Sequence, residues 1–127
     1  VWDMITAYSW PVGPQPQDLP EQYISALNSH DVSNLVSLYD DEAVHITADR
    51  TVQGDAALQA WYTTLLNQLI PGGKFTLTGK TGSGSYRSFT WQASSPKGSI
   101  TNGDDTLGLA GDKISYHYSY FTVTPAG

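Results

Sequence analysis

Residues 55–73 read DAALQAWYTTLLNQLIPGG and carry the clearest secondary-structure signal in the chain. Their apolar side chains repeat at the helical period until Pro71 and two glycines end the element. We expect a helix here with Asp55 as its N-cap. The sequence beyond residue 73 has strand character, so this stretch marks the change from a helical first half to a β-rich second half.

Two more helices are expected before this stretch. Asp18 is a candidate cap for a first helix that ends near Asn28. Asp31 is a candidate cap for a second helix whose apolar positions run as far as Tyr39, and residues 40–42 then close it with three acids. Tyr39 is therefore predicted to be helical.

The remaining elements are predicted to be strands. Residues 43–47 and 51–53 form a short hairpin in this interpretation. Four longer strands follow, separated by glycine-rich or Ser-Pro turns: 75–80, 86–93, 99–109 and 113–123. Helices followed by a long antiparallel meander predict an α+β domain with three helices packed on one face of a curved sheet.

Residues 18–127 are predicted to form this domain, and residues 1–17 a short strand and a proline-rich linker. Residues 8–10 resemble residues 118–120, Tyr-Ser-Trp beside Tyr-Ser-Tyr. The first segment is thus a candidate for the tail of a preceding, similar domain, or for an ordinary edge strand.

Composition excludes several classes of function. The chain has 127 residues, a size typical of one domain, and its net charge of −6 with scattered Lys and Arg leaves no basic stripe for nucleic acid. No apolar run approaches the roughly 20 residues needed to cross a bilayer, and no signal peptide is evident. Cysteine is absent, which leaves the compartment open, with the cytoplasm as the preferred expectation.

One carboxylate falls in an otherwise apolar strand pattern. Alternation over residues 105–109 places Asp105 on the same face as Leu107 and Leu109. A carboxyl group that faces a core must be hydrogen-bonded or protonated. Asp105 is therefore a candidate pocket residue, with a structural hydrogen bond as the alternative.

Three segments together resemble the nuclear transport factor 2-like superfamily: residues 23–31, 35–43 and 54–62. Residues 111–118 are similar to the last hairpin of that group. The resemblance covers nearly all of residues 18–124. It implies a cone-shaped, cystatin-like α+β fold with an apolar cavity between helices and sheet, and no cofactor.

Within the superfamily the chain is most similar to ketosteroid isomerase. The resemblance implies that Tyr23 is an oxyanion-hole tyrosine and that Tyr39 and Tyr62 orient it. Asp105 matches an aspartic acid that is kept protonated and donates a second hydrogen bond. The alternative for Tyr39 and Tyr62 is core packing.

The resemblance implies a catalytic base at position 47, and here the chain departs from the pattern of ketosteroid isomerase. The residue is Thr47, whose hydroxyl cannot accept a proton at neutral pH. His45, two residues earlier on the same face, and His117 on the last strand are candidate bases. The family register points His117, Ser119 and Phe121 inward. Simple alternation would instead give that strand an apolar face made of Ile114, Tyr116, Tyr118 and Tyr120.

The family register places those tyrosines on the convex face of the sheet, where we expect a homodimer. Further candidates for the pocket wall, each with core packing as its alternative, are Trp61, Phe89, Trp91, Leu107 and Phe121. The three histidines lack metal-ligand spacing, so no metal is expected.

These residues predict a protein that binds a small apolar or aromatic molecule, with isomerase or cyclase chemistry by general acid/base catalysis on a carbonyl-bearing substrate. The alternative is a non-catalytic ligand-binding or assembly domain of a longer protein, which the missing base favours. Epoxide hydrolysis ranks third, because Arg50 and Arg87 do not match the arginine which that chemistry requires.

Overall fold

A computed structural model describes residues 18–126, and the expected strand and linker at 1–17 lie outside the described residues. Three α-helices occur, and a π-helical segment extends the third. Their bounds are α1 Leu19–Ser29, α2 Val32–Val36, α3 Asp55–Thr64 and η2 Leu65–Leu69. The expected helix after Gly54 is confirmed, with its last turn widened to π geometry.

The strands form one sheet, with the order β2-β1-β6-β5-β4-β3 and β7 paired to β5. All neighbours are antiparallel except β1 and β6, which run parallel. The strand bounds are β1 Tyr39–Thr47, β2 Arg50–Gln53, β3 Lys74–Thr81, β4 Tyr86–Ser95, β5 Gly98–Ala110, β6 Lys113–Tyr120 and β7 Thr124–Pro125. The predicted meander of four long strands is confirmed.

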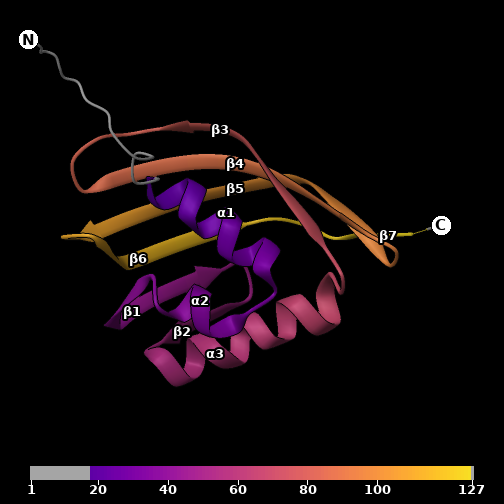
Figure 1. Cartoon of the computed structure of the whole chain (residues 1–127), viewed down its shortest axis with the longest axis horizontal. Coiled ribbons are helices and arrows are strands. Elements are labelled where there is room, and N and C mark those ends of the chain that lie inside the picture. Colours follow the sequence, from indigo (N-terminus) through magenta and orange to yellow (C-terminus); the bar gives the residue numbers. More distant parts are fainter. Residues whose placement is uncertain (1–17, 127) are drawn as a thin grey trace, which may run out of the picture.

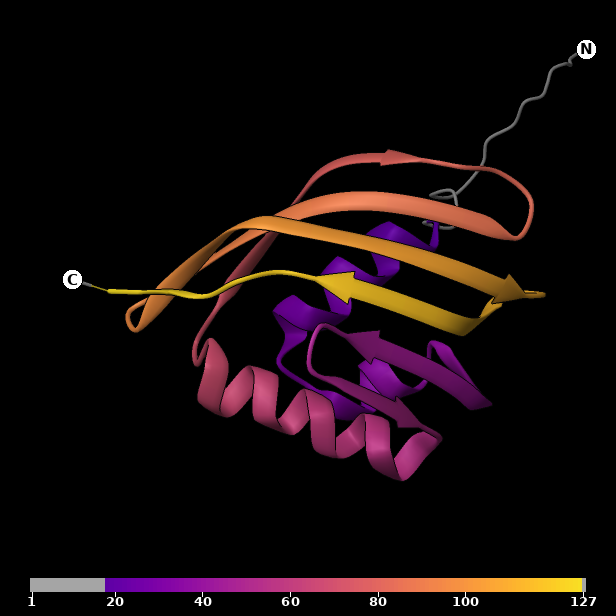
Figure 2. The ribbon, with the colours of Figure 1, turned by 180° about the vertical axis from the view of Figure 1, so that it is seen from behind.

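The sheet curves around the helices, so helices and strands enclose a core (Figure 1). Helix α1 packs against β3 and β4, whereas α3 packs against β1 and β2. Figure 2, from behind, shows β4, β5 and β6 crossing in front of α1. This is the predicted α+β class, with the helices on the concave side of a mostly antiparallel sheet.

The helix starts only partly follow the predictions. Asp31 caps α2, since its carboxylate accepts the backbone N–H of Ser33 at 3.0 Å. Asp18 occupies the N-cap position of α1 without capping it, and its carboxylate instead pairs with Arg87 Nε of β4 at 2.8 Å. The cap of α3 is Gly54 rather than Asp55, which is the first helical residue.

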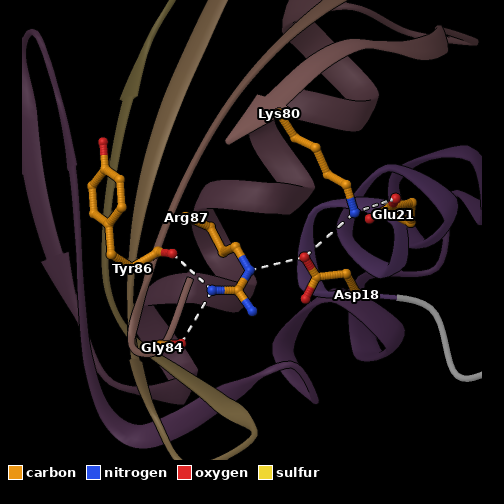
Figure 3. A network of polar contacts seen from close by, with 6 residues as sticks. All are labelled: Asp18, Glu21, Lys80, Gly84, Tyr86 and Arg87. Carbon is orange, nitrogen blue, oxygen red and sulfur yellow. Dashed lines mark hydrogen bonds and ion pairs between the residues drawn. The ribbon is translucent and has the colours of Figure 1, made fainter. Parts of the chain in front are cut away.

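A small ionic cluster fastens α1 to the sheet (Figure 3). Arg87 pairs with Asp18, and the Lys80 ammonium of β3 lies 2.7 Å from the Glu21 carboxylate. The hydrogen bond from Arg87 is the main reason that the pKa of Asp18 is lowered from its usual value. The cluster lies outside the core and serves to hold the first helix in place.

The predicted second helix is too long. Helix α2 ends at Val36, and Tyr39 belongs to β1, so the helical assignment of Tyr39 was wrong. The reason is tertiary: Tyr39 is opposite Ile114 in the parallel pairing of β1 with β6, and the Ile114 N–H donates to the Leu38 carbonyl at 2.9 Å. Strand pairing outweighs the helical spacing of the side chains.

A β-bulge near the start of β6 decides which of its side chains face the core. Gly108 is opposite Tyr116 and Leu109 is opposite Ile114, so β6 carries one extra residue, Ser115. Ile114 and His117 are consequently both buried although three residues apart. The inward register expected for His117 is confirmed, and the simple alternation that grouped Ile114 with the tyrosines was wrong.

Over residues 18–126 no helix has the length and apolar character needed to cross a membrane. The same residues contain no group of three or more His, Asp or Glu side chains placed to hold a metal ion.

Candidate functional site

Asp105 of β5 is the centre of a buried polar cluster. Its side chain has no exposed surface, and its Oδ1 accepts hydrogen bonds from Trp91 Nε1 at 2.8 Å and from Ser119 Oγ at 3.0 Å. Its Oδ2 lies 2.5 Å from His117 Nε2. Both oxygens therefore have protein partners, as a buried carboxyl group requires.

Three tyrosines continue the cluster from His117. The Nδ1 atom of His117 lies 2.7 Å from the Tyr39 hydroxyl, which lies 2.5 Å from the Tyr62 hydroxyl. Tyr62 donates to the Tyr23 hydroxyl at 3.1 Å. The hydrogen-bonded chain thus runs from Asp105 to Tyr23 and connects β5, β6, β1, α3 and α1.

The directions of these bonds follow from counting protons. Because the single Tyr62 proton is donated to Tyr23, Tyr39 must donate to Tyr62, and His117 Nδ1 must then donate to Tyr39. Burial is the main cause that raises the pKa of all three phenols well above the usual value. The tyrosines are therefore neutral, and one proton is shared between His117 Nε2 and Asp105.

Gly103 makes the contact between Trp91 and Asp105 possible. A Cβ atom at this position would lie 2.3 Å from the Trp91 ring, so only glycine lets the indole lie against β5. Sequence reasoning missed this residue, although a glycine inside a strand is a known signal of close approach. The acid, the indole and the glycine form one structural unit.

Two side chains within residues 18–126 have buried polar atoms without a hydrogen-bond partner: Glu21 at Oε1, and His45 of β1 at both ring nitrogens. Of these two residues, His45 is the fully buried one, with 1% of its surface exposed. Its ring centroid lies 4.4 Å from that of His117 and 5.7 Å from that of Trp61. Burial, followed by the nearby His117, lowers the pKa of His45 to about 2, so the imidazole is neutral.

A cavity of about 220 Å³ lies beside this cluster, where β6 ends. In Figure 2 the strand continues from there toward the C-terminus, with the last turn of the third helix below it. The wall combines apolar, hydroxyl and charged side chains: Thr47, Ala48, Asp49, Arg50, Trp61, Leu69, Ser119, Phe121 and Val123. We call this space the terminal cavity.

Trp61 and Ser119 connect the terminal cavity to the buried cluster. Ser119 lines the cavity and donates to Asp105. Trp61 lines it as well, with the Arg50 guanidinium 4.9 Å from its ring centroid on one side and His45 against it. One layer of side chains thus separates the cavity from the buried histidines.

A larger groove of about 650 Å³ lies on the outside of α2, α3 and β1. Its acids are Asp40, Asp41 and Asp55, and Tyr39 forms part of its wall. These carboxylates are at most half-buried, as expected for solvated helix and strand ends. Of the predicted site residues Tyr39 lines this groove, whereas Thr47, Trp61 and Phe121 line the smaller terminal cavity.

The structure brings most of the predicted site residues together. Tyr23 and Asp105 face one interior, but each has its own partners and neither lines the terminal cavity. Phe89 and Leu107 are buried, with Phe89 against the Tyr23 ring at 5.7 Å. The predicted residues that do line the cavity are Thr47, Trp61 and Phe121.

The sequence profile of the SnoaL-like domain matches residues 21–117. This match covers the helices and most of the sheet, including every member of the hydrogen-bonded chain from Tyr23 to His117. The chain therefore belongs to the SnoaL-like domain family, within the nuclear transport factor 2-like superfamily that the sequence resembles.

Solved structures share this fold at low sequence identity. An NTF-2 like protein of unknown function from Burkholderia xenovorans has a TM-score of 0.69 at 15% identity, over 85% of this chain and 83% of that one. A protein with a ketosteroid isomerase-like fold from Catenulispora acidiphila has a TM-score of 0.68 at 12% identity, over 81% and 84%.

The epoxide hydrolase/cyclase-like enzyme SalBIII, which has a role in pyran ring formation in the polyether salinomycin, also resembles the chain. It has a TM-score of 0.69 at 15% identity, over 81% of this chain and 87% of the other. At such identities the likeness concerns the fold alone. No curated protein matches the sequence.

Proposed function

We propose that the domain binds a small apolar or aromatic molecule in the terminal cavity. The observation that supports this is the composition of the wall, in which Trp61, Leu69 and Phe121 supply apolar surface and the Thr47 and Ser119 hydroxyls supply polar contacts. Ligand sites in proteins combine these features. The volume of about 220 Å³ suits a ligand of one or two rings.

The test is a titration with phenols and polyketide-like aromatics of one or two rings, beside a four-ring steroid that should be too large for the cavity, followed by ¹H–¹⁵N NMR. Binding should shift the signals of residues 47–50 and 119–123, and Val123→Trp, which fills the cavity, should abolish the shifts. Tyr118→Ala on the opposite face of the sheet is the matched control and should bind like the wild type. Shifts spread evenly over the domain, or none, would contradict this site.

Acid/base isomerase or cyclase chemistry is the second candidate, and the link between His117 and Asp105 favours it. In this proposal His45, whose ring nitrogens have no partner, takes a proton from the carbon next to a substrate carbonyl and returns it to a carbon further along the substrate. His117 can act as this base only once its bonds to Tyr39 and Asp105 are broken. Tyr23 donates its hydroxyl proton to the enolate oxygen, and Tyr39 and Tyr62 orient Tyr23. Asp105 adds a second hydrogen bond only when it is protonated and released from His117.

Such chemistry requires the substrate to reach groups that are now sealed, because Tyr23 is 2% exposed and Asp105 fully buried. The test is the absorbance change when a β,γ-unsaturated steroid ketone becomes conjugated. Tyr23→Phe and Asp105→Asn should each reduce turnover in a folded protein. No turnover in the wild type, with ligand binding retained, would favour the non-catalytic binding or assembly domain.

A homodimer through the convex sheet face is also proposed. Tyr116, Tyr118 and Tyr120 of β6 are 41%, 39% and 44% exposed there, an aromatic surface that suits an interface. Sedimentation velocity should give a dimer for the wild type and a monomer for Tyr118→Glu. A wild-type monomer at all concentrations would contradict the proposal.

A further inference from the structure

The unpaired ring of His45 sets it apart from the hydrogen-bonded side chains of the cluster around Asp105. Asp105, His117 and the three tyrosines all have hydrogen-bond partners within the protein. A buried polar group without a partner costs about 1–3 kcal/mol, so native proteins rarely keep one without a reason. A ligand that supplies the missing partner is such a reason.

The surroundings of His45 restrict what that partner is. Aromatic rings surround the imidazole, with Trp61 at 5.7 Å, Tyr62 at 5.8 Å and His117 at 4.4 Å between centroids. Planar ligands pack well among such rings. A neutral imidazole offers one donor and one acceptor but no charge to balance a buried carboxylate or ammonium group.

A route from the terminal cavity to His45 passes Trp61. This ring lies against His45 and also forms part of the cavity wall. Thr47, two residues beyond His45 on the same face of β1, lines the cavity too. Trp61 and Thr47 are therefore the side chains that stand between the terminal cavity and His45.

We infer that His45 hydrogen-bonds the hydroxyl group of a planar aromatic ligand, a phenol or a stable enol, whose ring enters from the terminal cavity past Trp61. This inference rests on the proposed ligand site and adds the chemical class of the ligand. A hydroxyl fits because it donates to the unprotonated ring nitrogen, or accepts from the protonated one, while remaining uncharged.

The experiment compares 2-naphthol with naphthalene, which has the same ring system without the hydroxyl, by calorimetric titration of wild type and His45→Phe. One hydrogen bond should make wild-type binding of 2-naphthol about 10-fold tighter than that of naphthalene. His45→Phe should bind both equally, since it keeps an aromatic ring but no nitrogen. Tyr118→Phe on the convex face is the control and should retain the preference.

Each outcome is decisive. If neither compound binds the wild type, both the cavity proposal and the role of His45 are overturned. If both bind equally to the wild type, or if His45→Phe keeps the preference, the role of His45 is wrong although the cavity stands.

Should His45→Phe fail to fold, the ring ¹⁵N signals of the wild type answer the question. The chain has three histidines, and His30→Asn and His117→Gln assign two of them, so the remaining signals belong to His45. The signals of His45 should move on addition of 2-naphthol and not on addition of naphthalene. If they respond to neither compound, a buried water is the only partner and the inference is overturned.

Discussion

The cluster around Asp105 and the terminal cavity lie one side-chain layer apart but differ in how their polar groups are paired. Within the cluster every polar side chain from Asp105 to Tyr23 has a partner. At the cavity side, His45 has none, and the Thr47 hydroxyl has only a 3.4 Å contact to the Arg50 carbonyl. A satisfied network stabilises a fold, whereas unpaired groups are free to bind something else.

The largest effect expected comes from removing the centre of the cluster. Asp105→Ala leaves Trp91, Ser119 and His117 without an acceptor and should lower the free energy of unfolding by about 3–5 kcal/mol. Urea denaturation measures it. Asp104→Ala, exposed on the neighbouring position of β5, is the control and should change stability by less than about 0.5 kcal/mol. An equal decrease in the free energy of unfolding for both variants would contradict a stabilising role of the cluster.

Gly103→Ala should have the next largest effect. The added Cβ would overlap the Trp91 ring and displace its hydrogen bond to Asp105, with an expected loss of about 3 kcal/mol. Gly79→Ala tests strand glycines in general, since its Cβ would meet only the Thr90 hydroxyl at 3.3 Å on the exposed edge strand. A thermal shift no larger for Gly103→Ala than for Gly79→Ala would contradict the packing described above.

The third prediction concerns pH and the unpaired histidine. The pKa of His45 is about 2 in the folded protein and near 6.5 when unfolded, so protons favour the unfolded chain below pH 6.5. Stability due to this group is complete above pH 6.5 and falls as the pH drops, by about 2 kcal/mol at pH 5. In His45→Phe the loss of unfolding free energy between pH 7.5 and 5 should be smaller by that amount. The same pH slope in both proteins would show that His45 is protonated when folded.

The smallest effect is expected at the rim of the cavity. Arg50→Ala removes the cation over the Trp61 ring, a contact worth about 0.5–1 kcal/mol at an exposed site. Thermal denaturation of Arg50→Ala beside Lys97→Ala, which removes an exposed charge in the β4–β5 turn, separates this contact from a general charge effect. A loss as large as that of Asp105→Ala would remove the contrast between cluster and cavity.

The sequence was sufficient for the order of helices and strands because their periodicity and turn residues are local signals. Residues 55–69 show this, since their helical period is realised as α3 and η2. Tyr39 shows the limit: its spacing is helical, but its place is decided by pairing with β6, more than seventy residues away. The spacing of neighbouring side chains carries no information about a strand partner so far away in the sequence.

The sequence predicted which residues lie together in the candidate site, but not which hydrogen bonds they form. Family resemblance placed Tyr23, Asp105 and His117 in one interior. It implied that Asp105 donates a hydrogen bond to a ligand, whereas Asp105 is occupied by Trp91, Ser119 and His117. That outcome depends on Gly103, which lets the Trp91 ring reach Asp105, and on the bulge at Ser115, which turns His117 inward. The bulge is set by the pairing of β5 with β6 and has no counterpart in residue spacing.

The π-helical segment at Leu65–Leu69 has a consequence for how this domain tolerates changes in length. The Ile70 N–H reaches back to the Leu65 carbonyl, five residues away, so the segment holds one residue more than an α-helix would. Deleting one residue, such as the exposed Asn67, would restore ordinary α-helical winding and leave the residues on either side facing much as they do now, because the π turn already accommodates one extra residue. Leu69 would then stay in the wall of the terminal cavity, so this turn is a place where the domain can lose one residue without losing its fold or its ligand site.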